Sequence, residues 1–142
     1  MYILISFLFK NTLNFSFCKE ERLISRKAFE TIVKEGKVYF SYPLRVMWQK
    51  TDSTDQFPAK VAFSVPKRKY KRANQRNLAK RRMREAYRLH KHLLYDVLEN
   101  NGCHVNILIV YIGSDILSYH EIEKKTIGLF NHIVEHIKKD AE

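Results

Sequence analysis

Apolar and polar positions alternate with two different periods along the chain, and each period predicts a type of secondary structure. In the stretch LISRKAFETIVKEG the apolar residues recur every three or four positions, which is typical of a helix with one buried face. Ser25 is a suitable N-cap for this helix, and Gly36 is a suitable terminator. The apolar face of the predicted helix consists of Ala28, Phe29, Ile32 and Val33.

Strand-like patterns follow this helix. The stretch KVYFSYPLRVMWQK is rich in aromatic and β-branched residues and is interrupted near Tyr42 and Pro43, which predicts two strands. After the turn-rich TDSTDQFP, the stretch AKVAFSV places Val61, Phe63 and Val65 on one face, as in a half-buried strand. The other face of this strand is small and polar, so it is predicted to stay open to a ligand.

The longest helical pattern comes next and ends at ENNG, where glycine can cap a helix. On a helical wheel its apolar residues fall within an arc of roughly 120°. They are Ala79, Met83, Ala86, Tyr87, His90, Leu93, Leu94 and Val97. The polar and cationic residues gather on the opposite side, and they are Asn77, Lys80, Arg81, Arg84, Arg88 and Lys91.

The last two elements are a buried strand, CHVNILIVYIG, and a helix that opens with the capping box SYHE at residues 118–121. Helical spacing predicts that Ile122, Leu129, Phe130, Ile133 and Ile137 are buried. The element order is therefore α-β-β-β-α-β-α. This order indicates an α+β fold, a two-layer sandwich with helices packed on a small mixed sheet.

Composition fits one domain with one core, because the chain has 142 residues of which 45% are hydrophobic. Its net charge of +11 is concentrated in one segment. Residues 67–91 hold 12 of the 26 Lys and Arg and one of the 15 acids, which leaves 14 of each elsewhere. So concentrated a charge indicates an anionic partner, with nucleic acid favoured over a membrane.

The N-terminal MYILISFLF is too short to span a bilayer and lacks the basic start of a signal peptide. We interpret residues 1–16 as a disordered extension or the product of a mistaken start, and residues 17–142 as the single domain. Cys18 and Cys103 show neither CxxC spacing nor a disulfide framework. They are predicted to be reduced thiols, which favours a cytoplasmic location.

A cationic helix face is often only a solvated surface that keeps a protein soluble. Here that interpretation is weak, because the face has almost no acids and its cations repel one another. Arginine predominates within the helix, which suits bidentate contact with phosphates. We therefore expect this helix to bind nucleic acid.

RNA is favoured over DNA as the partner. A helix-turn-helix would need a short helix packed just before the basic one, but a strand and the connector PKRKYKR precede it. Several aromatic residues could instead form a stacking surface for single-stranded RNA, with core packing as the alternative for each. They are Phe29, Tyr39, Phe40, Trp48 and Phe63.

The stretch FSVPKRKYKRANQRNLAKRRMREAYR resembles the protein subunit of bacterial ribonuclease P. That family has a Ser-Val-x-Lys-Lys/Arg strand end, followed by a helix with an Arg-Asn-Arg motif and then Lys-Arg-x-x-Arg. The matching residues are Ser64, Val65, Lys67, Arg68, Arg76, Asn77, Lys80, Arg81 and Arg84. The resemblance extends over roughly residues 17–138, including ERLISRKAFETIVKEGK at the first helix, and it implies a fold similar to domain 2 of ribosomal protein S5.

Two features depart from the family pattern. Leu78 stands at the third position of the Arg-Asn-Arg motif, and Arg82 is predicted to compensate elsewhere on the helix. The connector KRKYKRANQ is about one residue longer than in well-known members, with Tyr70 where small residues are common.

The resemblance implies a subunit of an endoribonuclease whose chemistry is carried by a large RNA subunit with Mg²⁺, held mainly by that RNA and the substrate. The holoenzyme removes the 5′ leader of precursor tRNA. No catalytic residue or metal ligand is expected in this chain. The RNA-subunit contacts implied by the family are Arg76, Asn77, Lys80, Arg81, Arg84 and Arg88. The implied leader contacts are Phe29, Val33, Trp48, Ser64, Lys67 and Arg68.

The expected partners are thus the ribonuclease P RNA and precursor tRNA, without DNA or a membrane. A non-catalytic RNA-binding module, such as a ribosomal or assembly protein, is the alternative, and a peripheral membrane protein led by the apolar N-terminus is a weaker third hypothesis. The motif HIVEH at residues 132–136 matches H-x-x-E-H of some zinc peptidases. The further ligand that such a site needs is missing from the pattern, and Ile133 and Ile137 indicate a packing helix instead.

Overall fold

The molecule is built around a four-stranded sheet. The computed structural model describes residues 15–141. Its strands lie in the order β1-β2-β4-β3, with β1, β2 and β4 antiparallel and β3 parallel to β4. The strand bounds are β1 (Lys37–Ser41), β2 (Leu44–Thr51), β3 (Ala59–Ser64) and β4 (His104–Tyr111).

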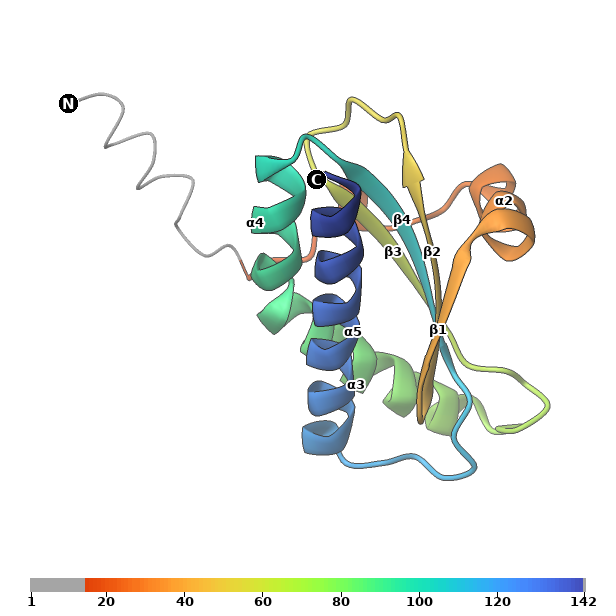
Figure 1. Ribbon diagram of the computed structural model, residues 1–142. Coiled ribbons are helices and arrows are strands. Elements are labelled where there is room, and N and C mark those ends of the chain that lie inside the picture. Colours follow the sequence, from red (N-terminus) through yellow and green to blue (C-terminus); the bar gives the residue numbers. More distant parts are fainter. Residues whose placement is uncertain (1–14, 142) are drawn as a thin grey trace.

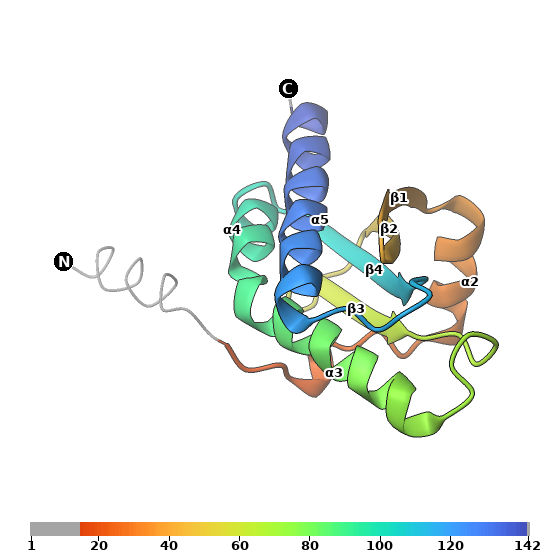
Figure 2. The same ribbon diagram turned by 90° about the horizontal axis from the view of Figure 1, so that it is seen from below.

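Helices cover both faces of this sheet (Figure 1). One face packs against α3 (Ala73–His90), α4 (His92–Asn100) and α5 (Tyr119–Asp140). The other face is crossed by α2 (Arg26–Glu35), which the short 3₁₀ helix η1 (Lys19–Glu21) precedes. Figure 2 shows α2 alone on its side of the sheet. A parallel strand pair needs a long crossover, which α3 and α4 supply between β3 and β4.

The predicted α+β class is confirmed, and so are the local signals that begin and end the helices. Ser25 Oγ accepts a hydrogen bond from the Ala28 amide, which caps α2. Ser118 caps α5 in the same way. Gly36 follows the last residue of α2, and only glycine fits there because a Cβ atom would lie 2.4 Å from the Ile32 carbonyl oxygen. Gly102 ends α4 with a φ of 61°, a conformation that costs glycine little.

The larger core lies between the sheet and the three helices. The five residues predicted to be buried on the last helix are all at most 1% exposed. Alternate residues of β2 and β4 point into this core from the sheet, as the period of a strand requires. They are Leu44, Val46 and Trp48 on β2, and Val105, Ile107, Ile109 and Tyr111 on β4.

A smaller core lies beneath α2. Ile32 packs there with Leu23, Met47 and Leu108, each of them at most 8% exposed. Register places Met47 and Leu108 opposite each other on β2 and β4. At Met47 and Leu108 the middle of the sheet is therefore buried on the α2 face as well as on the face of the larger core.

The predicted long helix is in fact two helices that meet at Lys91, at a bend visible in Figure 1. The prediction that Lys91 belongs to the exposed cationic face was wrong, because its side chain is only 4% exposed. Its Nζ donates to Glu21 Oε1 at 2.6 Å, and Tyr95 Oη donates to the same oxygen at 2.9 Å. The reason is a long-range ion pair: Glu21, itself fully buried, needs a cation beside it.

Candidate RNA-binding surface

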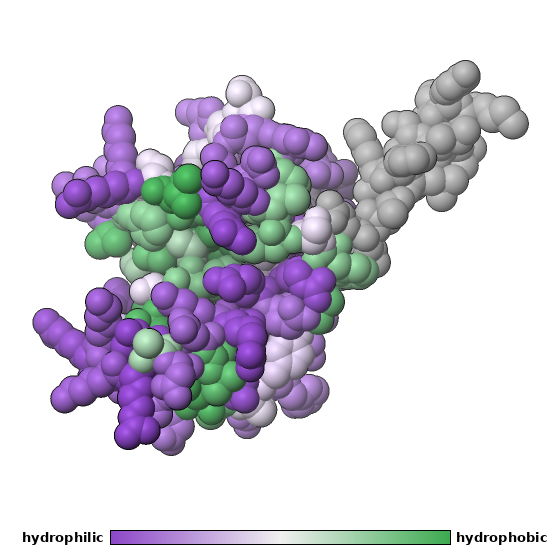
Figure 3. Space-filling model, turned by 180° about the vertical axis from the view of Figure 1, so that it is seen from behind, coloured by the Kyte–Doolittle hydropathy of each residue, from purple (hydrophilic) through white to green (hydrophobic). Residues whose placement is uncertain are grey.

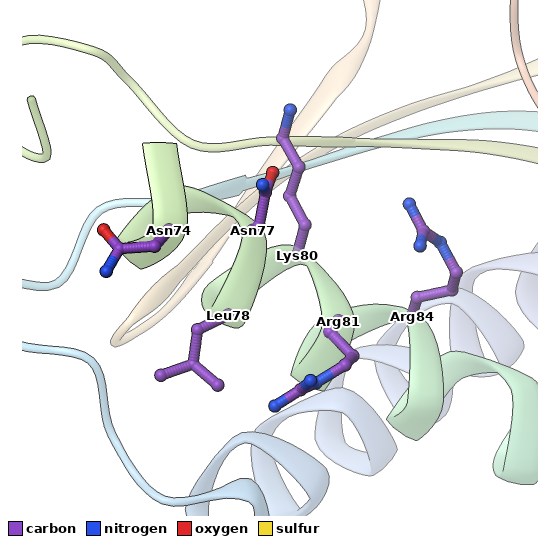
Figure 4. Close-up of a pocket in the computed structure, with 6 residues that line it drawn as sticks. All are labelled: Asn74, Asn77, Leu78, Lys80, Arg81 and Arg84. Carbon is purple, nitrogen blue, oxygen red and sulfur yellow. The ribbon is translucent and has the colours of Figure 1, made fainter. Parts of the chain in front are cut away.

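The first half of α3 carries a group of cationic side chains without partners. The depression that they surround has a volume of about 560 Å³ and is open to solvent. Its lining consists of Asn74, Asn77, Leu78, Lys80, Arg81 and Arg84 (Figure 4). Four of the predicted RNA-subunit contacts are thus brought together, and Leu78 and Arg81 extend to one side of α3 while Asn77 and Lys80 extend to the other.

This surface is positive because no acid neutralises it. Within residues 15–141, Lys80, Arg81 and Arg84 form no ion pair or hydrogen bond with another residue. The opposite side of α3 packs into the large core through Ala79 and Met83, which fixes the direction of the cationic side. The guanidinium groups keep their donors free, and such donors match phosphate oxygens in geometry and charge.

The other arginines of α3 are engaged within the protein. Arg76 Nη1 donates to the carbonyl oxygens of Tyr70 at 2.7 Å and Lys71 at 2.8 Å. Arg88 forms two hydrogen bonds with the Glu85 carboxylate, which hold the pKa of that carboxyl below its usual value. Arg88 Nη1 also donates to the Phe15 carbonyl at 2.9 Å. Arg76 and Arg88 are therefore held by internal contacts, unlike the four residues at the depression.

Arg82 does not compensate on the cationic face for Leu78. Its Nη1 donates to the Leu117 carbonyl at 2.6 Å, so it ties α3 to the loop before α5. That prediction was wrong because a helix position next to the apolar arc can reach a neighbouring loop.

The connector between β3 and α3, residues 65–72, is anchored by Tyr70. This side chain is 5% exposed, and its hydroxyl donates to the Gly113 carbonyl at 2.6 Å. Its ring lies 6.1 Å from that of Tyr111. Lys67 and Arg68 precede this anchor, are exposed, and pair with no other residue of the described chain.

On the α2 face of the sheet, a cross-strand row leads from β1 to the connector. Register places Phe40 opposite Arg45, Arg45 opposite Val110, and Val110 opposite Ser64. Phe29 packs on the smaller core from α2, and Val33 is 62% exposed. In Figure 3 this side of the molecule is hollowed between the region of α2 and the hydrophilic side chains near the connector.

Trp48 does not lie on this surface, and its predicted contact with a leader is wrong. It is 0% exposed and points toward α5, where its ring lies 5.7 Å from that of His136. Successive strand residues point to opposite faces, so a prediction that is off by one residue selects the wrong face. Met47 is the β2 neighbour that faces α2.

Sequence reasoning also missed Arg45 as a member of this surface, and it left Phe40 only as a general stacking candidate. The Arg45 guanidinium lies 5.4 Å from the centre of the Phe40 ring, and Phe40 is 62% exposed. The signal that was available is the two-residue turn at Tyr42 and Pro43, because a hairpin of that length fixes which residues oppose each other.

Residues 15–141 contain neither a membrane-spanning helix nor a cluster of metal ligands. No helix there is long and apolar enough to cross a membrane. In the same range, no three His, Cys, Asp or Glu side chains are grouped so that they could hold a metal ion. His132 and His136 of the HIVEH motif pack edge to face with ring centres 4.5 Å apart, beside Trp48.

Comparison with known proteins decides the family. The family model described as Ribonuclease P matches residues 17–134. The chain belongs to the ribonuclease P protein family. A ribonuclease P protein component from Porphyromonas gingivalis is 36% identical over 110 residues, which span 78% of this chain and 80% of the relative. One from Chlorobium phaeobacteroides is 35% identical over 103 residues, or 67% and 70% of the two chains.

Solved structures show the same fold. The ribonuclease P protein from Thermotoga maritima superposes with a TM-score of 0.64 at 22% identity, over 79% of this chain and 96% of that one. The protein from Staphylococcus aureus gives a TM-score of 0.59 at 20% identity, over 86% and 95%. The resemblance drawn from the basic motif is confirmed.

The structure shows where the two residues that depart from the ribonuclease P protein pattern, Tyr70 and Leu78, lie. Tyr70, where small residues were expected, is buried against the β4–α5 loop. Leu78, at the third position of the motif, lines the depression beside Arg81, so a hydrophobic side chain lies within the cationic surface.

Proposed function

We propose that the chain is the protein subunit of a ribonuclease P ribonucleoprotein that removes the 5′ leader of precursor tRNA. In this proposal α3 binds the catalytic RNA through Asn77, Lys80, Arg81 and Arg84. The open part of the α2 face binds the leader. The observation that carries the proposal is the group of cations on α3 that have no partner within the described chain.

The charge of α3 supports RNA as its ligand. Clustered cations without acids repel each other and lower the stability of a helix. An RNA backbone removes this repulsion, because each phosphate placed beside a cation releases a bound counterion and favours association. Lys67 and Arg68 extend the same positive surface toward the end of β3.

The α2 face supports a single-stranded ligand. Bases of single-stranded RNA stack on aromatic and guanidinium planes, and Phe40 with Arg45 presents both at the surface. Phe29 and Val33 border this area from α2, and Ser64 closes the row next to the connector. The two surfaces meet at the connector, as a subunit that joins a leader to an RNA requires.

The chemistry is assigned to the RNA subunit. Mg²⁺ takes oxygen ligands and commonly binds phosphates, which the RNA and the substrate both supply. The contribution of the protein is then to neutralise phosphates, so that two polyanions can approach each other at lower magnesium concentration. The protein would act in binding and positioning, without a catalytic residue of its own.

The test is cleavage of a precursor tRNA by a bacterial ribonuclease P RNA at low magnesium, with and without the protein. We expect strong stimulation that depends on the 5′ leader. The stimulation should be lost in a variant with Lys80→Ala, Arg81→Ala and Arg84→Ala. It should be retained in a control variant with Lys138→Ala and Lys139→Ala, at the far end of α5. Tight RNA binding without stimulation would contradict the proposal and indicate a general RNA-binding module.

A further inference from the structure

A row of polar side chains crosses the α2 face at the end of the sheet opposite the connector. Register places Gln49 of β2 opposite Asn106 of β4, and Asn106 opposite Lys60 of β3. The neighbouring row, which contains Met47 and Leu108, is apolar and lies under α2. The change from apolar to carboxamide side chains therefore occurs within two residues along each strand.

This polar row contributes to the lining of two adjoining hollows between α2 and the sheet. Their volumes are about 270 Å³ and 150 Å³. Ser25, Ala28, Thr51 and Asn106 line both of them. Each hollow is smaller than the roughly 300–1,000 Å³ of a drug-sized pocket, so it suits one small planar group.

The carboxamides of Gln49 and Asn106 have unused hydrogen-bonding capacity. Two neighbouring polar side chains are engaged: Thr31 Oγ1 donates to the Lys27 carbonyl at 2.9 Å, and Lys60 Nζ lies 2.7 Å from Asp55 Oδ2. Neither carboxamide forms a hydrogen bond with another residue between 15 and 141. Both side chains are only half-exposed.

Asn106 is also an unusual residue for an interior strand of a sheet. β4 lies between β2 and β3, and asparagine is depleted in strands because it neither packs nor pairs well there. A carboxamide presents a donor and an acceptor in one plane. This is the pattern with which asparagine and glutamine bind the edge of a nucleobase.

We propose that Gln49 and Asn106 form a base-reading site for one unpaired nucleotide of the RNA leader. The inference rests on the proposed function, and it adds base recognition at the far side of α2 to the binding near the connector. The exposed Lys27, which pairs with no acid of the described chain, stands at the rim and supplies a cation for the adjoining phosphate.

The experiment uses the reconstituted holoenzyme and precursor tRNAs that carry one abasic nucleotide at successive leader positions. For the wild type, one leader position should weaken binding about fivefold or more when abasic, the lower end of a bidentate base contact. Asn106→Leu should weaken binding of the intact leader by a similar factor and abolish the effect of that abasic position. Gln49→Leu is the second variant, with the same expectation.

The matched control is Asn131→Leu, which removes an exposed carboxamide from α5 on the opposite side of the sheet. It should bind as the wild type does. Additive effects of the abasic position and Asn106→Leu would overturn the base-reading site, and so would wild-type binding by both leucine variants. Wild-type protein that binds precursor and mature tRNA equally would overturn the proposed leader function itself.

Discussion

Arginines on one helix have two uses in this protein. Arg76 and Arg82 donate to backbone carbonyls and fix the connector and the loop before α5. Arg81 and Arg84 have no partner between residues 15 and 141 and remain available to a ligand. Substitutions on the two groups should therefore have different consequences, the first for stability and the second for binding.

The double variant Arg81→Ala with Arg84→Ala should weaken binding to the RNA subunit and flatten its dependence on salt. Each phosphate contact contributes about 0.9 to the slope of log affinity against log salt, so the slope should fall by about one to two. Affinity measured over a salt series gives this slope. The control variant, Lys138→Ala with Lys139→Ala, also removes two positive charges, but at the far end of α5. An equal change of slope in this control would contradict a specific binding site on α3.

Phe40→Ala should weaken binding of precursor tRNA while leaving the fold intact. The ring is 62% exposed, so its removal leaves no cavity. Stacking of a base on an aromatic ring is worth about 1–3 kcal/mol, and the lower value corresponds to roughly fivefold in affinity. Affinities for precursor and mature tRNA should be measured in parallel. Equal losses for both substrates would place Phe40 outside the leader surface.

At the scale of elements, the junction of α3 and α4 depends on the buried pair of Glu21 and Lys91. Lys91→Met should destabilise the protein by about 3–5 kcal/mol, because it leaves a buried carboxylate without its cation. Lys91→Met combined with Glu21→Leu should recover much of this loss. Urea unfolding measures both free energies. A double variant less stable than Lys91→Met alone would show that the pair is not the cause.

The limits of sequence-based prediction follow from the range of the interactions. Caps such as Ser25 and Ser118 act within three residues, and both were predicted correctly. The pairing of Lys91 with Glu21 spans 70 positions, so helical periodicity contains no sign of it. Trp48 is a different case, because strict alternation along β2 would have assigned it to the core.

The sequence predicted one part of the candidate site, the cations of α3, but not the cross-strand row on the sheet. The cationic residues of α3 were found because charge and helical period agree locally. The row that joins Phe40, Arg45 and Ser64 depends on strand register, and the position of β3 beside β4 is set only by the whole fold. The predicted extension at residues 1–16 lies mostly outside the described residues, which begin at residue 15.

At the scale of the whole molecule, stability should decrease as the pH falls below the usual pKa of histidine. Burial lowers the pKa of His132, with a further contribution from His136, so the folded state favours the neutral ring. The unfolded chain binds the proton first, at about 6.5. The stabilisation is therefore complete above that pH and is lost below it.

His132→Phe keeps a flat ring against Tyr39, whose ring is stacked on His132 at 4.1 Å. It should reduce the pH dependence of the unfolding free energy, measured in urea on both sides of about pH 6.5. Glu135 and Lys37 lie near His132 and act in opposite directions on its pKa. An unchanged pH dependence would assign the effect to other groups.

The parallel pairing of β3 and β4 determines how the two proposed RNA-binding surfaces are joined. The chain leaves β3 at Ser64, passes through the anchored connector into α3, and returns through α4 to the adjacent strand. The helix proposed to hold the RNA and the strand proposed to border the leader are thus joined through a short tether fixed at Tyr70. Under the proposed function, the folded protein would fix the distance between the RNA subunit bound on α3 and the leader bound beside β3. This fixed distance would then define the position at which the leader is cleaved.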